Sequence, residues 1–390
     1  MTFKTRLSVL VMCTPILAFV IIGGLMGRAS ALSGGEEDFQ HLKVFEDVVR
    51  LVMSNYVEEV KVDKVMEGAM RGLAEGLDPD SAYLNAAQVR EVESGKPLPE
   101  GEVGIELTRQ FYLRVIASRD HSPAARAGIQ TADYIRAIDG KPTREMSVFE
   151  GVRLLRGEPG SKVALTVLRG NAADTHEVTL VREKPAAAPV TAKMLGADAG
   201  YLRIPLFTAT TAADVDRHAG ELAKSGAKSL ILDVRHTAEG PIDAGIATAR
   251  LFVKSGTLTI KAGREKTGPR ETMAAKTGDG SITLPVSLLV TAGTSGAAEV
   301  FAAALQGNKR AELIGEHTIG RAAVQKLVKL PENRGLWLTY ARYLGPSGEP
   351  IHGPGLKPAV EVAEPDVEFG APAPTTDVIL NAALERRKAR

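Results

Sequence analysis

The strongest constraint on the fold of this chain is a regular alternation of strand and helix patterns that begins at residue 200. The patterns occur in the order strand Tyr201–Ile204, helix Ala212–Lys224, strand Ser229–Val234, helix Pro241–Val253, strand Val286–Thr291, helix Ala297–Gln306, and strands Ala311–Ile314 and Leu336–Tyr340. Alternation of this kind favours an α/β layer with mainly parallel strands. The Pro-, Ala- and acid-rich stretch Ala363–Thr376 then predicts an extended segment before a short last helix near Val378–Arg387.

A different pattern of short β-rich runs lies between Gly101 and Arg182. The runs at 112–117, 134–138 and 162–168 are bounded by Gly, Pro or Asp, and a helical pattern stands among them at 147–155. This spacing predicts a compact, partly open β-barrel. Pro stands at both ends of an Ala run in the stretch 184–189 that follows, which indicates a short stiff linker.

The segment that begins at residue 39 is predicted to form a small helical domain. Apolar residues recur at three- and four-residue steps, which predicts an amphipathic helix with one buried stripe; they are Phe39, Leu42, Phe45, Val49, Val52 and Tyr56. A second short helix near 65–73 runs into a turn that contains Asp78 and Asp80. For these two carboxylates we favour loop solvation and capping over metal binding.

The amino terminus has the features of an export segment. Lys4 and Arg6 precede an uncharged apolar run over residues 7–27, and Ala29-Ser30-Ala31 follows. This order is typical of a secretory signal, and an uncleaved membrane anchor is the close alternative. Either interpretation predicts a periplasmic or extracytoplasmic protein, which in the second case is anchored to the inner membrane. Membrane contact is expected only through this segment.

We therefore expect a multidomain α/β protein. Its predicted segments are a signal peptide or membrane anchor at 1–31, a helical domain at 39–98, a β-barrel-like domain at 99–183, an α/β core at 191–362, and a C-terminal linker and helix at 363–390.

Composition limits the function mainly by exclusion. Lys and Arg number 48 against 47 Asp and Glu, so the net charge of +1 provides no field that would attract nucleic acid. The single cysteine, Cys13, excludes a disulfide framework and a multi-cysteine metal site. If cleavage follows Ala31, the mature chain contains no thiol. We find no metal-ligand spacing and no phosphate-binding Gly loop, and we expect no cofactor and no metal.

The motifs resemble those of the C-terminal processing peptidases, also called tail-specific proteases. Residues 101–169 resemble the PDZ domain of that family, through Gly104-Ile105, Ser122–Ile129, Asp133–Ile135, Ile138–Gly140, and Leu155–Gly157 with Gly160. The protease core is recognisable in Gly200–Ile204, Leu230–Arg235, Gly315–Gln325 and Tyr343–Pro358. The resemblance covers the chain from about Phe39 to its end, and it implies a PDZ domain followed by a crotonase-like α/β core.

The PDZ resemblance implies a site for peptide tails. A PDZ domain adds a peptide as a strand to an exposed sheet edge, and backbone N–H groups of a loop capture its terminal carboxylate. The resemblance places that loop at Gly104 and Ile105, the strand at Glu106 and Leu107, and the opposite wall on the helix that carries Val152 and Leu155. The implied partners are protein C-terminal tails or unstructured peptides.

The family's catalytic dyad is absent from this chain. The family has a serine nucleophile at the start of a helix and a lysine that takes its proton. Alignment on Glu299 places Gly296 at the serine position and Arg321 at the lysine position, whereas Gln325 matches a glutamine associated with the dyad. Glycine has no hydroxyl, and a guanidinium stays protonated and cannot act as a general base. The dyad is degenerate at both positions.

The oxyanion region also departs from the family pattern. The Asn-Asn-Pro-Gly-Gly run of the family reads His236-Thr237-Ala238-Glu239-Gly240 here, and Ala297 follows the nucleophile position. A carboxylate at Glu239 would disfavour a nearby oxyanion. The fold can persist nevertheless, because Glu299 falls at the third helical position and can form half of a capping box.

Three hypotheses follow. The leading one is a catalytically inactive pseudo-peptidase that binds tails as a scaffold, as an adaptor or as the partner of an active protease. The second is an active endopeptidase that cleaves C-terminal segments of envelope proteins, with a site rebuilt around Ser295 and His317 or His236. The third is a structural oligomer of the envelope, assembled through the helical domain.

Overall fold

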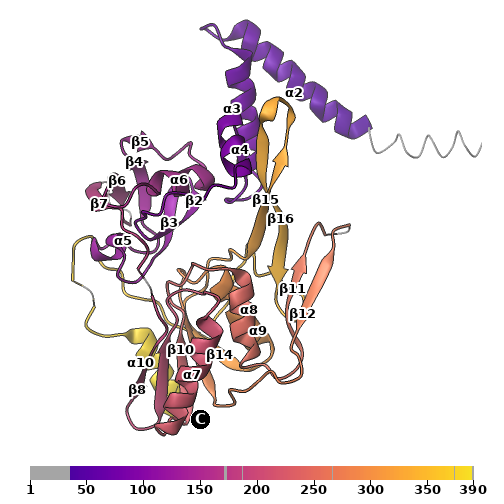
Figure 1. The fold of residues 1–390 in the computed structure, drawn as a ribbon. Coiled ribbons are helices and arrows are strands. Elements are labelled where there is room, and N and C mark those ends of the chain that lie inside the picture. The colour runs from indigo at the N-terminus through magenta and orange to yellow at the C-terminus, as the bar shows by residue number, and fades with distance from the viewer. Residues whose placement is uncertain (1–35, 171–173, 187, 266, 373, 389–390) are drawn as a thin grey trace, which may run out of the picture. The chain divides into compact units, whose positions relative to one another are not determined.

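The computed structural model describes residues 36–170, 174–186, 188–265, 267–372 and 374–388 (Figure 1). The chain divides into two compact units between Gly72 and Leu73. The expected export segment at 1–31, with Cys13, lies outside the described residues. Within the described ranges, no helix is both long and apolar enough to cross a membrane.

The amino-terminal unit contains helix α2 (Glu36–Asn55) and most of α3 (Val62–Glu75). The periodicity predicted the first helix correctly, but its apolar stripe is not buried. Leu42 is 62% exposed and Tyr56 is 60% exposed. The physical reason is that α3 is the only other described helix in this small unit, so the unit has too little chain to cover the stripe.

Residues 73–98 differ from the expected helical domain at 39–98. Strand β1 (Ala82–Leu84) pairs antiparallel with β16 (Gly335–Leu344), and the short helix α4 (Ala86–Glu93) follows it. An Asn85 capping box begins α4. These residues therefore belong to the larger unit, because their backbone hydrogen bonds and the contact of Leu84 and Val89 with Trp337 tie them to it.

The PDZ-like region is a six-stranded antiparallel sheet in the order β2-β3-β4-β6-β7, with β5 paired to β4. Helix α6 begins at the Ser147 N-cap and packs against β2, which is an edge strand. The element bounds are β2 Ile105–Gln110, β3 Tyr112–Ser118, α5 Pro123–Arg126, β4 Tyr134–Ile138, β5 Lys141–Pro142, α6 Val148–Leu155, β6 Lys162–Leu168 and β7 His176–Val181.

The core contains the expected α/β layer. Its sheet has the order β17-β14-β13-β10-β9-β8, and all of these strands run parallel except β8, which is antiparallel to β9. The bounds are β8 Thr191–Leu195, β9 Ala199–Arg203, α7 Thr211–Lys224, β10 Ser229–Asp233, α8 Ile242–Arg250, β13 Val286–Val290, α9 Ala297–Gly307, β14 Ala311–Gly315, β17 Val360–Glu361 and α10 Val378–Lys388.

Side-chain alternation along the central strands separates two apolar layers. Leu230 and Leu232 of β10 join the main core with α7, α8 and α9, whereas Ile231 of the same strand faces Ile379 of α10. Helix α9 is the centre of the main core, since all nine residues from Ala297 to Leu305 are buried. The residue that starts this helix is thereby held in a fixed position.

A second, antiparallel sheet was not predicted from the sequence, and the strand expected at Leu336–Tyr340 belongs to it as part of β16 rather than to the α/β layer. It has the order β1-β16-β11-β12, and β15 also pairs with β16. The bounds of its additional strands are β11 Thr257–Ala262, β12 Arg270–Ala274 and β15 Ala323–Lys329. Four of the five β12 residues are exposed, so this strand has no apolar face that a sequence pattern could reveal.

The C-terminal segment crosses from the core to the PDZ-like region and returns (Figure 1). Phe369 packs against the apolar cluster of the PDZ-like region and stacks on His176 with ring centroids 4.3 Å apart. Arg169 Nη1 donates to the Val367 carbonyl at 3.3 Å. The extended crossing segment and the last helix therefore lie where the composition predicted them.

Phe301 of α9 offers a test of this core. Its ring is fully buried, with centroids 5.6 Å from Phe207 and 5.9 Å from Phe252. We expect Phe301→Ala to lower the free energy of unfolding by about 3–5 kcal/mol, because it leaves a cavity that a packed layer cannot close. Urea titration would measure the loss. Phe111→Ala, at a side chain 60% exposed, is the matched control and should change little; equal losses would contradict this account of the core.

Candidate functional site

The turn between β13 and α9 carries a strained backbone at the expected nucleophile position. Gly296 is the N-cap of α9, with φ 60° and ψ −115°. Residues with a Cβ rarely adopt this conformation, and it costs them about 1–3 kcal/mol. A Cβ at this position would nevertheless meet no atom closer than the Arg321 carbonyl oxygen at 3.8 Å. The site has room for a serine, but glycine suits its backbone better.

A buried carboxylate, Glu299, fixes both degenerate dyad positions. Its oxygens accept hydrogen bonds from the N–H of Gly296 at 3.2 Å, Gly320 at 2.6 Å and Arg321 at 2.7 Å, and from Thr318 Oγ1 at 2.5 Å. The first of these is the half capping box expected from the sequence. Burial raises the pKa of Glu299, and the four hydrogen bonds act in the opposite direction. One buried side chain therefore holds the turn at Gly296 and the loop at 318–321 together.

Arg321 forms ion pairs in place of a general base. Its Nε donates to Asp80 Oδ1 at 2.8 Å, and its Nη1 donates to Glu106 Oε2 at 3.4 Å. Burial opposes the charged guanidinium, but the two carboxylates outweigh it and raise the pKa of Arg321. Asp80 is a site residue that sequence reasoning missed, since only a capping role was expected for it. Asp78 does cap the turn, accepting from the N–H of Ser81 at 2.7 Å.

Glu106 connects strand β2 of the PDZ-like region to the dyad region through its ion pair with Arg321. Burial is the main cause that raises the pKa of Glu106, to about 7, and the Glu239 carboxylate adds to the effect while Arg321 opposes it. Glu106 belongs to the edge strand β2, whereas Arg321 belongs to the core. Protonation of Glu106 near neutral pH therefore weakens its ion pair with Arg321.

The expected oxyanion region at Glu239 and Gly240 forms a second contact between the core and the PDZ-like region. Arg119 Nη1 donates to both carboxylate oxygens of Glu239, at 2.9 and 3.2 Å. Gly240 follows with φ 117°, and a Cβ there would lie 2.0 Å from the Phe207 carbonyl oxygen, so glycine is required. Ala297 is buried at the first position of α9. Arg119 gave no sequence signal, because its partner is 120 residues away along the chain.

The residues of the rebuilt site are not assembled. Ser295 is 2% exposed, and in the described part of the chain its hydroxyl has no hydrogen bond to either histidine. His236 contacts Thr131 Oγ1 at 2.9 Å and Glu364 at 2.9 Å, and His317 contacts the Thr318 carbonyl. Gln325 of β15 donates to Thr339 Oγ1 at 3.1 Å rather than to a dyad position.

The residues expected to bind a peptide lie on the loop before β2, on β2 and on α6, and these two elements pack against each other. Gly104 has φ 72°, and a Cβ there would lie 2.3 Å from Ser122 Cβ, so the loop before β2 requires glycine. Ile105, Leu107 and Leu155 are buried in the apolar cluster of this region, and Val152 packs against the cluster as a partly buried residue. The free side of β2 thus has the geometry that strand addition requires.

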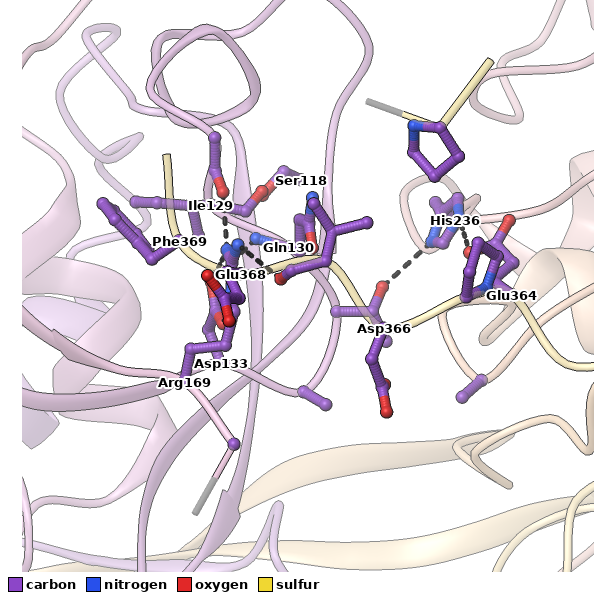
Figure 2. Close-up of a pocket in the computed structure, with 18 of the residues that line it drawn as sticks. Ser118, Ile129, Gln130, Asp133, Arg169, His236, Glu364, Asp366, Glu368 and Phe369 are labelled. Carbon is purple, nitrogen blue, oxygen red and sulfur yellow. Dashed lines mark hydrogen bonds and ion pairs between the residues drawn. The ribbon is translucent and has the colours of Figure 1, made fainter. Parts of the chain in front are cut away.

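A cavity of about 1340 Å³ lies elsewhere, between the PDZ-like region, the core and the C-terminal segment. Figure 2 shows Asp133 and Arg169 on one side of it and His236 with Glu364 on the other. Arg169 binds both oxygens of Asp133 at 2.7 Å, so much of the lining charge is already paired. None of the dyad positions lines this cavity. No cluster of metal-ligating side chains occurs among the described residues.

Sequence profiles of known families match three successive parts of the chain. They are the Activating protease CtpB N-terminal domain over residues 27–88, a PDZ domain over 114–169 and Peptidase family S41 over 198–362.

Individual relatives match most of the chain. It is 30% identical over 346 residues to a carboxy-terminal-processing protease of Bartonella bacilliformis, with 87% of this chain and 79% of the relative covered. It is also 30% identical over 371 residues to the carboxy-terminal processing protease CtpA of Bacillus subtilis, with 93% and 78% covered. A solved photosystem II D1 C-terminal processing protease superposes with a TM-score of 0.68 at 28% identity, covering 82% of this chain and 92% of that one. These matches confirm the resemblance and the fold class.

Gly296→Ser should destabilise the protein, because it forces a Cβ into the strained conformation at the start of α9. We expect a loss of about 1–3 kcal/mol in the free energy of unfolding, measured by urea titration. The control is Gly220→Ser in α7, where a Cβ meets no atom within 4 Å and φ is not positive. That variant should be neutral or slightly more stable. A Gly296→Ser protein as stable as the wild type would show that this backbone conformation is not maintained.

The raised pKa of Glu106 predicts a pH-dependent stability. The folded state holds the proton more tightly than the unfolded state, so the stabilisation is complete below about pH 4.5 and disappears as the pH rises through about 7. The side chain is 32% exposed, so after discounting we expect the wild type to lose about 1 kcal/mol more than Glu106→Gln between pH 5 and pH 8. Urea titrations at both pH values measure this difference. Glu158→Gln, at an exposed carboxylate, should follow the wild type; an unchanged pH slope in Glu106→Gln would contradict the assignment.

Proposed function

Because the chain belongs to the carboxy-terminal processing protease family, with a PDZ domain ahead of a peptidase family S41 core, we propose that it is an exported pseudo-peptidase that binds protein tails without cutting them. With a tail bound, the protein acts as a scaffold, as an adaptor or as the partner of an active protease. The proposed export is supported by the basic start and apolar run of the amino terminus.

The observation that carries the proposal is the pairing of Arg321 with Asp80 and Glu106 beside Gly296. A Ser–Lys mechanism needs a hydroxyl and a neutral amine, and the amine becomes neutral when burial lowers its pKa. Here the hydroxyl is missing, and the base position holds a guanidinium, which stays protonated and pairs with two carboxylates. The frame around Glu299 is retained, which supports a protein that keeps the fold and lacks the chemistry.

Tail binding is supported by the free edge of β2 and its apolar wall. An extended peptide can pair with β2, and alternate side chains would contact Val152 and the apolar residues around it. This part of the proposal does not depend on the dyad, so binding and cleavage can be tested separately.

The absence of cleavage is tested on the wild-type protein. We expect no time-dependent cleavage of an unstructured substrate such as β-casein and no labelling by a fluorophosphonate probe above that of the heat-denatured chain. The matched variant is Ser295→Ala, which should behave as the wild type does. Cleavage by the wild type that disappears in Ser295→Ala would instead establish a rebuilt site and overturn the proposal.

A double variant that restores both dyad residues tests which other parts of the catalytic site are missing. Gly296→Ser with Arg321→Lys supplies both groups of the dyad, but Asp80 and Glu106 would hold the new lysine in its charged form. We therefore expect little activity from the double variant at neutral pH, an increase in activity with pH, and a lower pH of onset when Asp80→Asn is added. The initial rate of β-casein cleavage as a function of pH measures this, and an onset that Asp80→Asn leaves unchanged would contradict the role given to Asp80.

A further inference from the structure

The turn between β2 and β3 presents an aromatic ring to solvent on a strained backbone. Phe111 has φ 69° and is 60% exposed. This backbone region is unfavourable for a bulky residue, which lacks the local hydrogen bonds that Asn or Asp can make there. The ring lies edge-on to the Tyr112 ring, with centroids 5.0 Å apart, and the Arg144 guanidinium lies 4.4 Å from its centroid. Because more than half of Phe111 is in water, packing within the protein does not explain a phenylalanine at this position.

Aromatic and cationic side chains also cover the outer face of the sheet beside this turn. Leu113 of β3 and Ile135 of β4 are partners in the register, and both side chains are fully buried. Because side chains alternate along a strand, the residues that flank this pair lie on the outer face; they are Tyr112, Arg114, Tyr134 and Arg136. The Arg114 guanidinium lies 5.7 Å from the centroid of the Tyr134 ring. Rings and guanidiniums therefore continue from the outer face to the turn.

This end of the PDZ-like region also carries unpaired positive charge. We call it the turn surface, which consists of Phe111, Tyr112, Arg114, Tyr134, Arg136, Lys141 and Arg144. Segments 107–118 and 134–145, which contain these residues, hold five Lys and Arg and only two Asp and Glu, although the whole chain has a net charge of +1. Arg136, Lys141 and Arg144 are exposed, and they form no ion pair within the part of the chain that the structure describes.

An anionic bilayer surface fits these features better than a protein partner does. Aromatic side chains are enriched at the level of the lipid headgroups, and Lys and Arg near the surface are attracted to anionic lipids. A single exposed ring has only to insert, whereas a stable protein interface buries on the order of 1,200–2,000 Å² and is depleted in lysine. The basic start and apolar run of the amino terminus also predict that the chain is delivered to a membrane.

We propose that the turn surface binds the anionic face of a lipid bilayer, with the Phe111 ring inserted among the headgroups and the exposed cations against the lipid phosphates. This contact is a second one beside the amino-terminal segment, and it holds the PDZ-like region against the membrane. The inference goes beyond the proposed function. It depends neither on tail binding nor on the absence of cleavage, so each can fail without the other.

Tryptophan fluorescence measures the insertion at one position. Trp337 is the single tryptophan of the chain, so Phe111→Trp in a Trp337→Phe background reports on the turn alone. The purified full-length chain is incorporated into phosphatidylcholine vesicles with or without phosphatidylglycerol, and the acyl chains are either unmodified or brominated near the headgroup. We expect brominated lipids to remove about half of the emission when phosphatidylglycerol is present and less than about a tenth when it is absent. Tyr112→Trp provides the same measurement if urea titration shows that the first variant does not fold.

The matched position is Val181, on β7 at the opposite edge of the same sheet and 41% exposed. Val181→Trp in the same background should keep its emission in every kind of vesicle. Equal quenching at the two positions would show that the amino-terminal segment alone brings the whole chain to the lipid. That result would overturn the inference.

Charge removal tests the contribution of the cations. Arg136→Gln with Arg144→Gln should reduce the quenching in Phe111→Trp to the level seen in phosphatidylcholine alone, because these side chains supply the attraction to anionic lipid. Lys224→Gln with Lys228→Gln removes the same charge from exposed positions of the core and should leave the quenching unchanged. Quenching that persists without the two arginines or without anionic lipid would contradict the role of the cations. No quenching in any folded variant would assign the turn surface to another partner, such as an acidic protein, and either result overturns the inference.

Discussion

The hydrogen bonds to one buried carboxylate hold the centre of this protein together. Glu299 is fully buried at the start of α9, and it joins the N–H groups of Gly296 and Arg321 through a single side chain. Charge burial of this kind is stable only when every acceptor is satisfied, and here four donors converge on it. Helix α9, the turn before it and the loop at 318–321 therefore keep their mutual geometry even though neither dyad residue is present.

Compared with the family pattern, this chain differs in the charges around the dyad positions as well as in the two dyad residues. A lysine base would need an apolar or cationic setting that lowers its pKa, whereas position 321 faces the carboxylates of Asp80 and Glu106. Position 239 carries a further carboxylate, which Arg119 of the PDZ region neutralises. The residues at the former catalytic positions thus take part in contacts between the core and the rest of the larger unit.

Local patterns in the sequence predicted helices α6 to α10 and the buried strands β9, β10, β13 and β14 of the core, because burial imposes a period on them, but they did not predict the short helices α4 and α5. Alignment on Glu299 also located Gly296 and Arg321, and α9 begins one residue after Gly296. The ion pairs were not predictable in the same way, since Arg321 and Asp80 are 241 residues apart along the chain and only the tertiary fold brings them together. Strand β12 was not predicted because four of its five residues are exposed and only Met273 packs against the core, which leaves no hydrophobic alternation in the sequence.

The ion pairs of Arg321 and of Arg119 differ in their exposure and in their partners. Arg321 pairs with Glu106 at 3.4 Å on a partly exposed side chain, and the raised pKa of Glu106, about 7, weakens this contact near neutral pH. Arg119 is almost fully buried, cannot lose its charge and pairs with Glu102 as well as with Glu239, so protonation of Glu106 leaves a second contact between the PDZ-like region and the core in place.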